Sequence, residues 1–150
     1  MNNSEIKIYV SSDVTTDEQR KREIHLCESL KEAGYSVVSE WEHYATTPLD
    51  AEKSQMTAAR DLQLESDALL VIADSLTLDT LFAIGLFHGR RAGLVCADGN
   101  NENKLPIILY WETNAGRQNV KTIEVFADIV LHGGNDLVSF EDKLRAFSQR

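Results

Sequence analysis

The chain has 150 residues, of which 43% are hydrophobic and 26% charged, with a formal net charge of -9 and a pI near 4.8. This length suits one domain over residues 1–150, and the composition excludes disordered and collagen-like proteins. The acidic balance disfavours nucleic acid as a partner, because it repels a phosphate backbone.

Neither a leader nor a membrane anchor is indicated. The first five residues lack the basic and apolar regions of a secretory signal, and no apolar stretch approaches the roughly 20 residues of a membrane-spanning helix. We therefore expect a cytoplasmic protein without membrane contact. Cys27 and Cys96 lie too far apart for a CxxC pair or a zinc knuckle, so we expect two reduced core thiols.

The first elements are a strand and a capped helix. Apolar residues alternate with polar ones over residues 6–10, which predicts a strand with Ile6, Ile8 and Val10 on one face. Thr15 and Thr16 are followed by Glu18 and Gln19 at capping-box spacing, and this predicts the start of a helix. Gly34 then predicts its end.

A second strand is expected over residues 35–39, followed by a loop over residues 40–44. That loop carries Glu40, Glu42 and His43. A second helix is predicted from Asp50 to Glu65.

The centre of the chain contains an apolar run over residues 68–73 without polar alternation, typical of a strand covered on both faces. The third helix is predicted from Thr80 to Arg90, with Leu81, Ile84 and Phe87 or Leu86 buried.

The last third is less regular. Short apolar runs at residues 94–97 and 106–110 predict two strands, separated by a turn at Asp98–Asn101. A last strand is expected over residues 126–131, and a final helix follows with Ser139 as its N-cap.

Strands that alternate with helices predict an α/β fold. We expect an open, mostly parallel sheet with helices on both faces, in a three-layer flavodoxin-like or Rossmann-like arrangement. Ligands of such sheets bind at the carboxyl ends of the strands, beside a topological switch point.

Three segments should converge at that edge: residues 11–13, 40–43 and 74–80. Ser11 and Ser12 could present hydroxyls and N–H groups to an anion, or could simply cap a helix. Neither the GxGxxG pattern nor a P-loop is present, so classical dinucleotide binding and P-loop hydrolysis are disfavoured and no cofactor is expected.

Several titratable residues are candidates for chemistry. Glu40 and Glu42 could tune His43 as an acid or base, although a solvated histidine is the simpler interpretation. No second histidine or cysteine lies at ligand spacing, so no metal site is expected. Asp61 and Asp79 also have simpler interpretations. Asp61 could be part of a surface ion pair, and Asp79 could stabilise a helix N-terminus without any further role.

Taken together, Lys7–Ser12, Asp61 followed by Ser66–Val71, and Asp79–Gly89 resemble the nucleoside 2-deoxyribosyltransferase family, whose members include nucleotide N-glycosidases. The resemblance covers most of residues 6–97. It implies a small-molecule nucleoside or nucleotide partner and chemistry at the N-glycosidic bond. Thr80, Ile84 and Gly85 fit the family pattern at the start of a helix.

One departure from the family pattern concerns catalysis. Ala83 occupies the position of the catalytic glutamate, which attacks the anomeric carbon in the family chemistry. Asp79, one helical turn away, could substitute for it, as could Asp61. The C-terminal part also lacks the Asn-Leu-Met run by which family members reach a neighbouring site. The substrate-binding residues implied by the resemblance are Tyr9, Ser11, Ser12, Thr80 and His43.

Three functional hypotheses remain open: an active N-glycosidic enzyme, a non-catalytic nucleotide-binding relative, and an interaction domain of flavodoxin-like or Toll/interleukin-receptor-like type. We expect Asp61, Asp79 and Tyr9 to face one cavity that Ser11 or Ser12 also borders, because all of them should lie near strand ends or helix starts. We further expect a homo-oligomer, most simply a two-fold dimer, because the third helix is apolar nearly all round.

Overall fold

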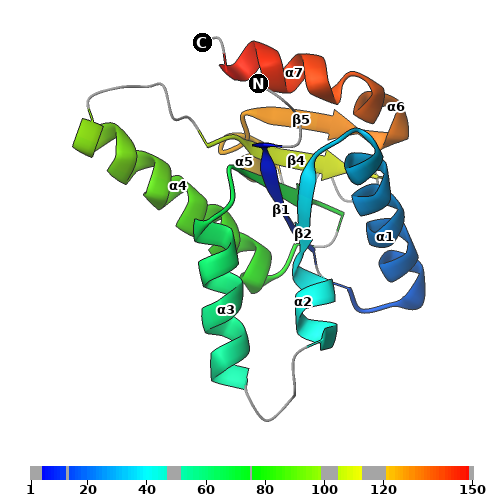
Figure 1. Cartoon of the computed structure of the whole chain (residues 1–150). Helices are drawn as coiled ribbons and strands as arrows, with labels where there is room; N and C mark the ends of the chain where they lie inside the picture. The colour runs from blue at the N-terminus through cyan, green and yellow to red at the C-terminus, as the bar shows by residue number, and fades with distance from the viewer. Residues whose placement is uncertain are drawn as a thin grey trace.

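Five parallel strands form the centre of the molecule in the computed structural model, which describes residues 5–12, 14–46, 52–74, 76–98, 105–112 and 121–148 (Figure 1). Their order in the sheet is β2-β1-β3-β4-β5, and every pair is parallel. The strands are β1 (Lys7–Ser11), β2 (Ser36–Ser39), β3 (Ala68–Ile72), β4 (Ile107–Trp111) and β5 (Ile129–His132). The predicted α/β class with a parallel sheet is confirmed.

Helices cover both faces of this sheet, as Figure 1 shows. They are α1 (Asp17–Glu32), α2 (Glu40–Thr46), α3 (Glu52–Leu64), α4 (Leu78–Asp98), α5 (Lys121–Glu124), α6 (Gly133–Val138) and α7 (Phe140–Ser148). Side chains of α1 and α7 share one buried apolar cluster with the sheet, and side chains of α4 share the other. The molecule therefore has the expected three layers.

The alternation along β1 assigns its side chains to these two clusters. Ile8 and Val10 lie in the cluster with α1 and α7, and Ile6 packs against it. Tyr9, between them in sequence, lies in the cluster with α4. The predicted register of this strand is confirmed, because successive strand side chains point to opposite faces.

The strand order has a consequence for the position of a site. β1 pairs with β2 on one side and with β3 on the other, so the chain reverses its direction of progress across the sheet at β1. In open parallel sheets the crevice at such a switch point, beyond the carboxyl ends of the strands, is where ligands bind. Here that crevice lies at the ends of β1, β2 and β3.

The predicted limits of α1 are confirmed. The Thr16 hydroxyl accepts the N–H of Gln19, and the Gln19 side chain accepts the N–H of Thr16, which is a complete capping box. At the other end Gly34 adopts φ 94°, a backbone conformation that glycine reaches without a Cβ clash.

The segment expected to be a loop after β2 is the helix α2. Ser39 ends the strand, and its hydroxyl accepts the backbone N–H of Glu42 at 3.1 Å, in the manner of an N-cap. The Ser39-x-x-Glu42 spacing is a capping-box signal that the sequence interpretation missed. Glu40 is therefore the first residue of a helix and not part of an irregular loop.

The third predicted helix is longer than expected, because α4 continues to Asp98 and includes residues 94–97, which were predicted to be a strand. A four-residue apolar run does not distinguish a strand from a helix segment, and the breaker cluster begins only at Asp98. Ile84 and Phe87 are buried as expected, whereas Leu81 is 43% exposed. The prediction that Leu81 faces the core was wrong.

The C-terminal elements differ from their predicted limits by a few residues. Residues 126–131 were expected to form the last strand, but β5 covers Ile129–His132 and is preceded by α5. The short helix α6 was not expected; the Asp136 carboxylate caps it by accepting the N–H of His132 at 2.8 Å. Among the described residues, no helix has the length and apolar character needed to cross a membrane.

Candidate functional site

Polar side chains gather where the parallel strands end. Ser11 closes β1, Ser39 closes β2, Asp74 follows β3 and Glu112 follows β4. These residues lie at one edge of the sheet because parallel strands share their direction. The edge divides into a half at β1 and β2 and a half at β3 and β4.

Glu40 is the most unusual group of the first half. Its side chain is buried, and its carboxylate accepts a hydrogen bond from the Ser11 hydroxyl at 2.7 Å and another from the backbone N–H of Ser12. Burial, assisted by the negative charges of Asp79 and Glu23, raises the pKa of Glu40 to about 7, although both hydrogen bonds oppose this shift. Glu40 is thus close to half-protonated at neutral pH.

Glu23 is a second buried carboxylate, supplied by α1. It accepts hydrogen bonds from the hydroxyls of Ser12 and Ser39, the latter at 2.6 Å. Burial raises the pKa of Glu23, and the two serine hydroxyls oppose the shift. Glu23 and Glu40 therefore lie close enough to interact, and both are held by hydroxyl groups instead of cations.

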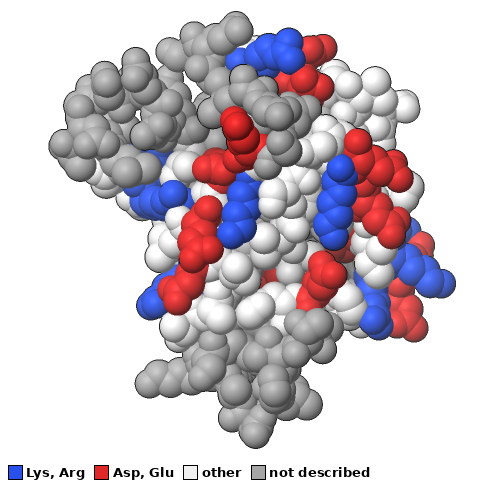
Figure 2. Space-filling view, in the orientation of Figure 1, with Lys and Arg blue, Asp and Glu red and all other residues white. Residues whose placement is uncertain are grey.

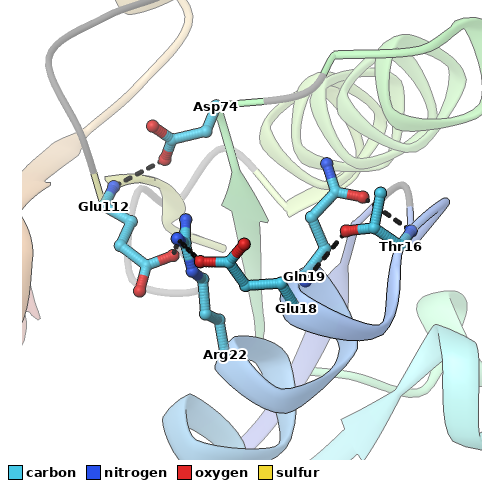
Figure 3. A network of polar contacts seen from close by, with 6 residues as sticks. All are labelled: Thr16, Glu18, Gln19, Arg22, Asp74 and Glu112. Carbon is cyan, nitrogen blue, oxygen red and sulfur yellow. Dashed lines mark hydrogen bonds and ion pairs between the residues drawn. The ribbon is translucent and has the colours of Figure 1, made fainter.

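The second half of the edge holds a different polar network (Figure 3). The Asp74 carboxylate accepts the backbone N–H of Glu112 at 2.6 Å. Arg22 extends from α1 toward this edge and forms ion pairs with Glu18 and, at 3.5 Å, with Glu112. Both acidic partners raise the pKa of the Arg22 guanidinium.

The structure places two of the family-implied residues in the apolar cluster with α4. Tyr9 and Ala83 are both fully buried there. Ala83, which was expected to stand at the position of the family's nucleophile, is a buried methyl group on the inner face of α4. No covalent chemistry can occur at this side chain.

The start of α4 assigns separate roles to Asp79 and Thr80. Thr80 is fully buried, and its hydroxyl accepts the N–H of Thr77 at 2.9 Å and donates to the carbonyl of Thr77. Because the backbone N–H of Thr80 also reaches the Thr77 hydroxyl at 3.4 Å, the pair caps the helix. Asp79 is exposed, and its charge acts on Glu40.

Asp61 and His43 lie on other helices. Asp61 belongs to the second half of α3, where its exposed carboxylate forms an ion pair with Arg60 at 2.9 Å. This ion pair is the simpler of the two interpretations of Asp61. His43 lies in α2, three residues after Glu40 and thus on the neighbouring turn.

The predicted site residues are thus brought together only in part. Ser11, Ser12 and Asp79 all act on the carboxyl of Glu40. Across the residues that the structure describes, no group of three or more His, Cys, Asp or Glu side chains could hold a metal ion.

Two clefts flank α1 near this edge. One, of about 220 Å³, includes Ser39, Trp41 and Glu42 beside α1. The other, of about 310 Å³, includes Arg22 and Glu112 and lies between the middle of α1, the end of β4 and α6. The volumes of both clefts are at or below the lower end of the range for small-molecule sites.

Sequence reasoning missed Glu23, although a signal was present. The buried positions of α1 are Glu23, Leu26, Cys27 and Leu30, which follow the i, i+3, i+4, i+7 spacing of an apolar face. A carboxylate at the first of these positions is a polar residue where the pattern requires an apolar one. Buried acidic residues of this kind need hydrogen-bond partners, which the two serines supply.

Comparisons with known proteins bear on the fold alone. No family model and no curated protein sequence matches the chain. Among solved structures, a pilus assembly-related protein from Burkholderia pseudomallei is 19% identical with a TM-score of 0.56, over 98% of this chain and 92% of that chain. A pilus assembly protein, CpaE, from Burkholderia thailandensis is 20% identical with a TM-score of 0.55, over 97% of this chain and 99% of that chain.

Proposed function

We propose that the chain binds a nucleoside or nucleotide at the ends of β1, β2 and β3 and acts, slowly, on its N-glycosidic bond. The observation that carries this proposal is Glu40, a buried carboxyl at the switch point whose pKa lies at about 7. A general acid works best with a pKa near the operating pH, and this group meets that condition.

Glu40 and Asp79 together offer the two carboxyl groups that glycosidic bond cleavage uses. Glu40 is buried and partly protonated, whereas Asp79 is exposed in the first turn of α4. Two carboxyls in such different environments can divide the roles of acid and anion between them. Glu40 would donate its proton to the departing base as the N-glycosidic bond breaks, and Asp79 would stabilise the positive charge that develops on the sugar. Water would then add its hydroxyl to the anomeric carbon, and the proton that it releases would return Glu40 to its protonated form.

The resemblance to the nucleoside 2-deoxyribosyltransferase family supports the choice of bond and substrate. The charge of the site favours an uncharged nucleoside as the first probe, because Glu23, Glu40 and Asp79 would repel a 5′-phosphate. Slow turnover is expected because the family's nucleophile position is Ala83, and loss of a positioned nucleophile costs several orders of magnitude in rate.

The test is an assay of the common deoxynucleosides and their 5′-monophosphates, in which chromatography measures the free base that is released. We expect slow release that falls as the pH rises above 7, and a loss of about 100-fold in Glu40→Gln and in Asp79→Asn. Asp142→Asn, an exposed carboxylate of α7, is the matched control and should have no effect. Asp61→Asn tests the other candidate carboxylate and should also leave the rate unchanged.

A second candidate is binding without catalysis, and it is favoured by the burial of Ala83 in an apolar cluster. Ground-state binding survives the loss of a nucleophile when the rest of a pocket is intact. In this case nucleosides should raise the melting temperature without any release of base. If none of these probes produces a thermal shift or turnover, both candidates are overturned.

A further inference from the structure

The outward face of α4 is apolar over four turns. Leu78, Leu81 and Phe82 are 83%, 43% and 61% exposed, and they follow the i, i+3, i+4 spacing of a single stripe. The same stripe continues along the helix with exposed small residues, Gly85, Gly89, Ala92 and Gly93. Exposed helix faces normally carry charged residues, so an uncharged stripe of about 22 Å requires an explanation.

The core does not explain this stripe, because the opposite face of α4 already packs against the sheet. Within residues 78–93 of α4, whose burial is described, the buried residues are Thr80, Ala83, Ile84 and Phe87, which lie on that inner face. A helix that is apolar on both faces is typical of a protein interface.

We propose that two copies of the chain associate across a two-fold axis through their α4 helices, packed antiparallel and crossing near Gly85. The stripe is large at one end and small at the other, which suits this arrangement. An antiparallel pair places the large end, with Leu78 and Phe82, against the small end of the partner helix, with Gly89 and Gly93. A parallel pair would instead place the large residues of the two helices against each other at one end and the glycines against each other at the other end.

The glycines of the stripe have room that a partner could fill. A Cβ built at Gly85, Gly89 or Gly93 meets no atom of the chain within 4 Å. These positions therefore do not need glycine for packing within one copy, and glycine costs up to about 1 kcal/mol relative to alanine in a helix interior. Small residues at four-residue spacing let two helix backbones approach closely.

The charges at the two ends of the stripe also favour an antiparallel pair. Asp79 lies exposed in the first turn of α4. Arg90, beyond the middle of the stripe, bonds the Ser66 carbonyl through one guanidinium nitrogen and is the cation of that end, since Arg91 is already ion-paired with Asp128. Antiparallel packing brings the acidic end of one helix to the basic end of its partner, whereas parallel packing would align like charges. In an isologous dimer this contact between the acidic and the basic end forms twice, because the two-fold axis repeats it.

Sedimentation of the full chain at micromolar concentration tests this proposal. We expect a species with twice the 16.8 kDa mass of one chain. Gly89→Glu should convert it to a monomer with an unchanged helical signal in circular dichroism, because the new side chain meets open space within one copy. Gly134→Glu, at an equally open glycine of α6, is the matched control and should stay dimeric.

A second pair of variants tests the large end of the stripe. Phe82→Asp should abolish the dimer, and Val138→Asp, at an 88% exposed position of α6, should not. In oxidising conditions Gly85→Cys should form a disulfide-linked dimer, whereas Gly134→Cys and the wild-type chain should not. A monomeric wild-type chain, or a dimer that tolerates both Gly89→Glu and Phe82→Asp, would overturn the proposal.

Discussion

The two halves of the sheet's carboxyl edge treat their acidic residues in opposite ways. At β1 and β2, Glu23 and Glu40 are buried and receive hydrogen bonds from serine hydroxyls, and the pKa of each is raised. At β4, Glu112 is partly exposed and pairs with Arg22, whose own pKa is raised. In one half burial favours the protonated form of the two carboxyls, and in the other half a cation pairs with the acidic side chain.

This difference indicates which half of the edge can donate a proton near neutral pH. The Arg22 guanidinium cannot serve as an acid near neutral pH, because arginine is not deprotonated in proteins. Burial raises the pKa of Glu40 to about 7, so this carboxyl is available as an acid near neutral pH. The proposed chemistry is accordingly assigned to the half that contains Glu40.

We expect the largest loss of stability when a carboxyl is placed in the buried region without hydroxyl partners. Ala83→Glu would put one into the apolar cluster with Tyr9, and we expect the free energy of unfolding to fall by about 3–5 kcal/mol at pH 8. Chemical denaturation measures this. Ala146→Glu, at an exposed position of α7, is the control and should change stability little. Equal stabilities of the two variants would show that the space around residue 83 is open to water.

The next largest effect is the pH dependence of stability that Glu40 causes. Its pKa rises from 4.5 to about 7 on folding, so between these pH values the folded state binds more protons than the unfolded state. Stability therefore falls as the pH rises through this window, by about 3 kcal/mol in total. We expect Glu40→Gln to be similar to the wild type near pH 4.5 and more stable by about that amount at pH 8.

Denaturation of both proteins at several pH values checks this prediction. Glu112→Gln, the matched change in the other half of the edge, is measured in parallel as the control for removal of one negative charge. A wild-type chain whose stability relative to Glu40→Gln is the same at pH 4.5 and pH 8 would contradict the prediction.

A smaller effect is expected from Ser39→Ala. This change removes a hydroxyl that donates to Glu23 and accepts from the N–H of Glu42, so both the buried carboxylate and the start of α2 lose a partner. We expect a loss of about 2 kcal/mol at pH 8. In Ser29→Ala the lost hydroxyl bonds only a carbonyl of its own helix at an exposed position, and stability should be nearly unchanged. Equal losses in the two variants would argue against a role for Ser39 in the buried network.

The smallest effect is expected in the half of the edge shown in Figure 3. Arg22→Gln breaks ion pairs with Glu18 and Glu112 that are largely in contact with solvent. We expect a loss of less than about 1 kcal/mol, which decreases further as salt is added because exposed charges are screened. Acidic and basic side chains are also intermixed on the surface in Figure 2, which is the usual setting of such weak pairs. A large loss that is insensitive to salt would show that the two halves are more alike than we infer.

Local patterns of the sequence were sufficient for much of the fold. The alternation in β1, the capping box of Thr16 and Gln19 and the glycine after α1 each act within a few residues, so they can be recognised in the chain itself. The same local signals failed where two structures share one pattern. The run at residues 94–97 is apolar in either a strand or a helix, and only its continuity with α4 decided the matter.

The sequence by itself determined the parallel α/β architecture, and it placed Ser11 and Ser12 at the end of the first strand and Asp79 at the start of a helix. Only the tertiary structure decided which carboxyl those residues act upon. Ser11 bonds Glu40 across 29 positions of sequence, and Ser39 bonds Glu23 across 16. Such pairs depend on which strands become neighbours and on the depth at which each helix packs. The pKa of a carboxyl follows from burial and from these distant partners, and neither quantity is encoded in the residues adjacent to it.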